Sequence, residues 1–116
     1  MIGLFHQKYH VAVYGEDASL VNRIVNKLRS WFKNEVVVES YTDTHQMLVD
    51  FNVAQAKNKP FDMAILGPEE GMESKIFLKH TNPLMDIIGY KDEKTLKKET
   101  VRLSMKRSKE LRLVKL

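Results

Sequence analysis

A chain of 116 residues is long enough for one domain, and its 43% hydrophobic and 29% charged residues are ordinary for a soluble globular protein. It contains no cysteine, which excludes disulfides, thiolate metal sites and thiol nucleophiles. No apolar run approaches the roughly 18 residues of a membrane helix. The apolar start Met1–Phe5 has no basic leader, so we expect a cytoplasmic protein without a membrane partner.

The net charge of +4 is unevenly distributed along the chain. Residues 91–116 hold ten of the 19 Lys and Arg residues but four of the 15 acids, a net charge of +6. Such a segment is either a solvated helix face or an electrostatic surface for an acidic partner or nucleic acid. No aromatic residues alternate with these lysines to stack on bases, so nucleic acid is the less favoured partner.

Strand and helix patterns alternate along the first three quarters of the chain. Short β-branched or apolar runs predict strands, and apolar residues at helical spacing predict the helices between them. Asp17 or Ser19 can cap the first helix, and Asp43 can cap the second. The expected strands are 10–14, 35–40, 61–66 and 84–88, and the third helix is expected over 72–80.

The last quarter is open to two interpretations. Asp92 can cap a short helix, the alternation of Val101, Leu103 and Met105 predicts a fifth strand over 100–106, and a last helix follows. The alternative is one helix across residues 92–109. With the fifth strand, the chain is one α/β domain, 1–116, with a doubly wound five-stranded parallel sheet of order 2-1-3-4-5. Helices on both faces make this a flavodoxin-like three-layer arrangement.

The stretch Pro60–Pro68 reads as a central strand buried on both faces, which Gly67 and Pro68 terminate. In open α/β sheets, ligands bind just beyond the carboxyl ends of the strands. Gly67 occupies that place and has no side chain.

Glu16 and Asp17 directly follow the first strand and precede a helix, and this opening resembles that of a response-regulator receiver domain. In that family, two acids after strand one hold Mg²⁺, an aspartate after strand three accepts a phosphoryl group, and a lysine ends strand five. The resemblance places Glu16 and Asp17 at the metal-binding acids and Lys106 at the lysine. It places the phosphoacceptor at Gly67, and the proline that usually follows the lysine is Arg107. In receiver domains, a Ser or Thr ends strand four. The corresponding position here is Ile88 or Gly89, and neither side chain has a hydroxyl group.

The resemblance therefore implies a pseudo-receiver that is not an enzyme and needs no cofactor. Weak Mg²⁺ binding by Glu16 and Asp17 is the alternative to a purely structural role, in which Asp17 caps the helix. A second alternative is a phosphoacceptor of another kind, Glu69 or Glu70, in the loop after Gly67.

The resemblance also implies signal transduction through protein contacts. Receiver domains commonly form dimers or bind partners through helix four, strand five and helix five, which maps to residues 92–116. The chain is then either whole or the N-terminal part of a longer regulator with an attached output domain. The residues expected on this face are Tyr90, Leu96, Leu103, Lys106, Lys109 and Arg112.

Other chemistry has little support in the sequence. The four histidines are scattered, so they do not predict a metal site. The glycine-rich motifs that bind dinucleotides or phosphates are absent from the sequence.

Overall fold

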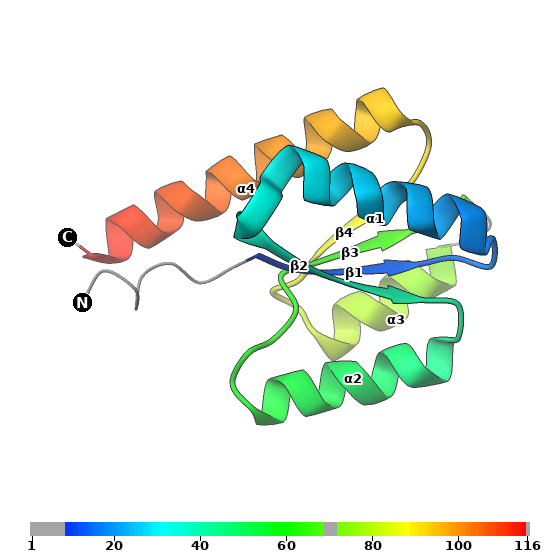
Figure 1. Cartoon of the computed structure of the whole chain (residues 1–116). Helices are drawn as coiled ribbons and strands as arrows, with labels where there is room; N and C mark the ends of the chain where they lie inside the picture. The colour runs from blue at the N-terminus through cyan, green and yellow to red at the C-terminus, as the bar shows by residue number, and fades with distance from the viewer. Residues whose placement is uncertain (1–8, 69–71, 116) are drawn as a thin grey trace.

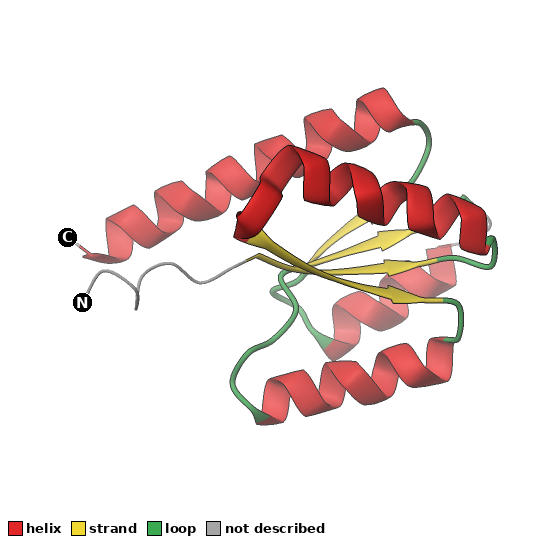
Figure 2. Ribbon diagram, viewed as in Figure 1, coloured by secondary structure: helices red, strands yellow, loops and turns green. Residues whose placement is uncertain are grey.

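The structure is a computed structural model that describes residues 9–68 and 72–115. Strands and helices alternate along the chain, with a short 3₁₀ turn over Lys33–Glu35 after the first helix. Figure 2 shows three layers, with the sheet between two pairs of helices. The elements are β1 (Tyr9–Tyr14), α1 (Ala18–Phe32), β2 (Val36–Tyr41), α2 (Thr44–Ala56), β3 (Met63–Leu66), α3 (Met72–Thr81), β4 (Asp86–Gly89) and α4 (Glu93–Lys115).

The sheet is parallel, with four strands in the order β2-β1-β3-β4. β1 and β3 occupy the centre, and their register places Val11 beside Met63 and Tyr14 beside Leu66. α1 and α4 cover one face of the sheet, and α2 and α3 cover the other (Figure 1). The α/β class, the parallel sheet and the order of its first four strands are as the sequence predicts.

Each face of the sheet has its own hydrophobic core because successive strand residues point to opposite faces. Val13 and Ile65 lie in the core beneath α1 and α4, whereas Ala12 and Leu66 lie in the core beneath α2 and α3. All four are completely buried. This burial on both faces explains why the central strands read as continuous apolar runs.

Three aspartates set the beginnings of helices, because their side chains accept hydrogen bonds from otherwise unpaired backbone amides. Asp17 accepts from the amides of Ser19 and Leu20 at 3.0 and 3.3 Å, and caps α1. Asp43 caps α2, and Asp92 caps α4. The predicted caps are therefore confirmed.

The predicted fifth strand is wrong, since residues 93–115 form one helix of 23 residues. The alternative of one continuous helix in this region is the better description. Its inward side is formed by Leu96, Thr100 and Leu103, which are spaced four and three residues apart and are buried, whereas Val101 and Met105 are exposed. The period-two alternation is therefore incidental, and no glycine or proline interrupts residues 91–116.

The third helix forms where the sequence predicts it, and α3 buries Leu78 and leaves Ile76 61% exposed. No helix in the described parts of the chain is long and apolar enough to cross a membrane.

Candidate interaction site

The carboxyl end of the sheet, where the sequence places the site, carries glycine at three of its four strands. Gly15 follows β1, Gly67 follows β3 and Gly89 ends β4. The Gly15 amide donates to the Tyr41 carbonyl at 3.2 Å, and the Gly67 amide donates to the Tyr14 carbonyl at 2.8 Å. Gly15 and Gly67 are buried, and their amides already donate to neighbouring strands, so neither amide is available to bind a ligand.

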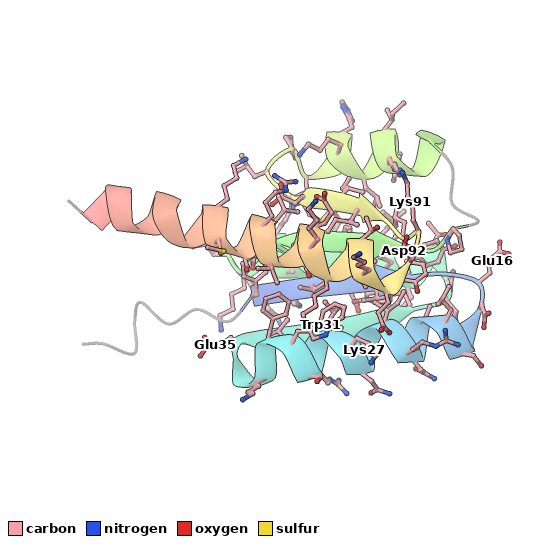
Figure 3. All side chains as sticks on the ribbon, turned by 90° about the horizontal axis from the view of Figure 1, so that it is seen from above. Glu16, Lys27, Trp31, Glu35, Lys91 and Asp92 are labelled. Atoms are coloured by element: carbon pink, nitrogen blue, oxygen red, sulfur yellow. The ribbon has the colours of Figure 1, made fainter. Side chains whose placement is uncertain are left out.

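The two acids after β1 do not point at a common centre with a third ligand. Asp17 is the cap of α1, and the exposed Glu16 projects outward from this end of the molecule (Figure 3). Within residues 9–68 and 72–115, no three His, Asp or Glu side chains gather in a way that could hold a metal ion. Glu69 and Glu70 lie outside the described residues.

Lys106 does not lie at the carboxyl end of the sheet. It lies 13 residues into α4, and a helix rises about 1.5 Å per residue, so roughly 20 Å separates it from the start of the helix. α4 runs back along the sheet, antiparallel to the strands (Figure 1). The expected cluster of Glu16, Asp17 and Lys106 is therefore not formed.

The expected interaction face is also rearranged by the continuous helix. Leu96 and Leu103 are 2% and 7% exposed and belong to the core, and Tyr90 packs partly buried against the same core. Leu96 and Leu103 are therefore not available to a partner, whereas Tyr90 keeps part of its surface exposed. Lys106 is exposed, and the side chains of Lys109 and Arg112 lie outside the part that the structure describes.

The outward side of α4 is cationic. Its buried stripe leaves the opposite side of the helix to solvent, and the basic residues fall on that side. The acids of the same region are engaged, since Glu99 binds Arg102 at 2.8 Å and Asp92 caps the helix. The exposed basic residues of this helix are Lys94, Lys97, Lys98, Arg102 and Lys106.

Contacts from α1 hold α4 in place. Lys27 lies 3.6 Å from Glu93, and the Lys97 ammonium lies 5.9 Å from the centre of the Trp31 ring. Lys27 and Trp31 face α4 along the seam between the two helices in Figure 3. A cation over an indole ring is favourable, so Lys97 faces α1 at this seam, and the other exposed basic residues of α4 are Lys94, Lys98, Arg102 and Lys106.

A cleft of about 430 Å³ follows β4 on the side away from β3. Its floor is the strand itself, and α3 and α4 form its walls from opposite faces of the sheet (Figure 1). The Lys79 ammonium donates to the Met85 carbonyl at 2.9 Å. The lining residues are Lys75, Ile76, Lys79, Asp86, Ile87, Ile88, Glu99, Arg102 and Leu103.

The lack of a side chain at Gly89 leaves room for Lys75, the second lysine of the cleft. A Cβ atom added at Gly89 would stand 2.8 Å from the Lys75 Nζ, so the ammonium lies directly over the end of β4. Lys75 and Lys79 are four residues apart on α3 and therefore share one side of the helix. That spacing was visible in the sequence, but the strand that the two lysines cover was not.

Two further clefts adjoin one another at the β2 edge. They are about 270 and 500 Å³ and share His10, Glu39 and Lys59. His10 stacks on Phe61 with ring centres 3.7 Å apart. These contacts are structural, because the ring stacking and the bond from the His10 amide to Asp62 tie β1 to the segment before β3.

Tyr41 belongs to the same edge. Its hydroxyl donates to Asp50 at 2.7 Å. Burial is the main cause that raises the pKa of Tyr41 far above its ordinary value, and the hydrogen bond to the Asp50 carboxylate is the second cause. The phenol therefore stays protonated and links β2 to α2, and it offers no acid or base near neutral pH.

Comparisons with protein-family models, with curated proteins and with solved structures found no match. The candidate interaction surface consists of the exposed basic residues of α4 and the cleft that α4 shares with α3.

Proposed function

We propose that this chain is a non-catalytic protein-binding module that takes part in regulation through contacts with an acidic partner. Its parallel sheet, with the order of the first four strands of a receiver domain, supplies a rigid frame. The receiver resemblance supports a signalling role, but the chain lacks a side chain at the phosphoacceptor position.

The observation that carries the proposal is the placement of positive charge. The net charge of +6 in residues 91–116 is concentrated on one helix whose exposed side carries five basic residues. A single-sign surface attracts oppositely charged partners and speeds their association, and this attraction weakens as salt is added.

Support also comes from the other end of the molecule. The described residues after β1, β3 and β4 bring together no set of ligands or nucleophiles, because Asp17 caps a helix and glycines occupy the strand ends. A binding role accounts for the charged surface without requiring chemistry at the strand ends.

The test uses two charge-reversal variants of the whole chain. Lys98→Glu with Lys106→Glu changes the exposed side of α4, and Lys57→Glu with Lys59→Glu makes the same change of charge at exposed positions near α2. Binding of fluorescent poly-L-glutamate is measured by anisotropy at low salt. We expect the α4 variant to bind about tenfold more weakly, since each exposed pair contributes up to ~1 kcal/mol.

The α2 variant should keep more than half of the affinity. Equal losses in both variants would mean that net charge alone is responsible, and the surface assignment would be wrong. Duplex DNA is measured in parallel, because tighter, steeply salt-dependent DNA binding through α4 would indicate a nucleic-acid partner instead.

A further inference from the structure

β4 is an outer strand of the described sheet. The amides of Asp86 and Tyr90 point inward, donating to the carbonyls of Asp62 and Leu66 at 3.0 and 2.8 Å. Backbone groups of alternate residues in a strand point to opposite sides, so the N–H and C=O groups of Ile87 and Gly89 face away from β3. Such an edge is a template for one more strand.

The cleft along this edge exists because residues 100–106 belong to a helix and do not form the fifth strand that the sequence predicts. Residues 100–106 lie on α4, above the sheet, so no strand in the described parts of the chain covers β4. The cleft runs beside the strand, and α3 and α4 leave it open between them. It therefore has the place and the walls that an added strand requires.

The α3 wall of the cleft is positively charged, because it carries Lys75 and Lys79. On the α4 wall, Arg102 is paired with Glu99 at 2.8 Å, and Asp86 also acts electrostatically on this guanidinium. The remaining positive charge of the lining therefore lies on the two lysines of α3.

We infer that the β4 edge binds an extended acidic segment of another protein, which joins the sheet as a fifth strand. This inference rests on the proposed function and gives it a binding mode. Main-chain hydrogen bonds would form with Ile87 and Gly89. Carboxylates at alternate positions of the segment would all point to one face of the sheet, toward Lys75 and Lys79 of α3.

A second copy of this chain fits the edge less well. Two β4 strands meeting about a twofold axis would bring the lysines and Arg102 of both copies close together, and like charges that face one another disfavour association. An acidic strand removes that repulsion. Lys75 can move aside to admit it, because its ammonium lies at the end of a flexible side chain over Gly89.

The experiment uses the whole chain and two synthetic peptides. The probe is an eight-residue peptide that alternates Glu with Val or Thr, and its control carries the same residues with N-methyl groups on alternate amides. The control keeps the charge but cannot form a complete ladder of hydrogen bonds. Affinity is measured by calorimetry, and amide hydrogen exchange at Ile87 and Gly89 is measured by NMR.

We expect the unmethylated peptide to bind at least tenfold more tightly and to slow exchange at Ile87 and Gly89. Lys75→Glu with Lys79→Glu should abolish this binding, whereas Lys57→Glu with Lys59→Glu should not. Equal binding of both peptides would overturn strand addition and leave the charged surface of the proposed function intact.

Two other outcomes would also overturn the inference. Slow exchange at Ile87 and Gly89 without peptide, together with a dimer in sedimentation, would identify a second copy as the occupant. Failure of both peptides while poly-L-glutamate still binds through α4 would place the partner on the outer side of the helix. If poly-L-glutamate fails as well, the proposed function itself is wrong.

Discussion

The carboxyl end of the sheet and the β4 edge differ in what their residues leave available. At the carboxyl end, buried glycines close the strands and Asp17 is used as a helix cap. At the β4 edge, backbone groups face outward between two walls that carry lysine and arginine. The difference teaches that, in the described residues, the groups left available for a partner lie along the edge of the sheet and not at the strand ends.

The lysines beside β4 also affect which strands can pair with its outer edge. Lysines near an edge discourage unspecific pairing with other sheets, because their charge resists burial. Lys79 further occupies the Met85 carbonyl at one end of β4. In the proposed binding mode, an acidic segment would pair with these same lysines.

The largest expected effect tests whether α4 packs on the sheet as a helix and so forms one wall of the cleft beside β4. Leu103→Ala should lower the free energy of unfolding by roughly 2–5 kcal/mol, since a large apolar side chain is removed from the core. Its 7% exposure places it there. Met105→Ala, at 57% exposure, should change stability by about 0.5 kcal/mol or less. Urea denaturation of both variants measures the difference.

A fifth strand would give a different result. Residues 103 and 105 would share one face of a strand, so both substitutions would be costly. Similar losses of unfolding free energy in the two variants would therefore show that residues 103–105 are not helical. The cleft beside β4 would then lack its α4 wall.

The next effect tests the closed carboxyl end. Gly67→Asp should lower the free energy of unfolding by about 1–3 kcal/mol, because it places a carboxylate at a buried position. We expect Mg²⁺ not to restore stability, since Asp17 caps α1 and Glu16 points outward. Thermal unfolding with and without Mg²⁺ measures this.

Gly67→Asn is the matched control, because it has nearly the same shape without the charge. A rise in Tm with Mg²⁺ in the aspartate variant alone would mean that the acids can converge on a metal. The strand ends would then be a degenerate receiver site. The carboxyl end of the sheet would differ less from the β4 edge, because both regions could bind a ligand.

The smallest effect concerns the start of α4. Hydrogen bonds from Thr95 hold the pKa of the Asp92 carboxyl below its ordinary value. A lowered pKa means that the ionised carboxylate stabilises the fold above the unfolded pKa, about 3.9. This contribution is lost as the pH falls through the folded pKa. Asp92→Ala should therefore have a lower Tm at pH 7, and the difference should shrink below about pH 4.

Thermal scans of both proteins from pH 7 to pH 3 test this dependence. A constant difference across that range would mean that the carboxylate does not act as a charged cap. The start of the helix would then depend on the contacts of its buried side chains and of α1, and not on the charge of Asp92.

The elements with strong local signals were predictable. Asp17, Asp43 and Asp92 have short side chains that satisfy nearby amides, so a single residue identifies a helix start. The central strand stood out because β3, Met63–Leu66, is apolar at every position, as burial on both faces requires. The last quarter misled the prediction, because Val101, Leu103 and Met105 alternate as in a strand. Burial decided otherwise, through Leu96, Thr100 and Leu103.

The sequence by itself determined the parallel α/β class, the order of the first four strands, the helix caps and the missing side chain at Gly67. The class, the caps and the glycine follow from local patterns, and the strand order is that of the commonest short doubly wound sheet. Only the tertiary structure decided that residues 93–115 form a helix, that β4 is an edge, and that Lys75, Lys79 and Arg102 meet along it. The physical reason is that these features depend on which surface each segment covers, and residues far apart in the sequence make that surface.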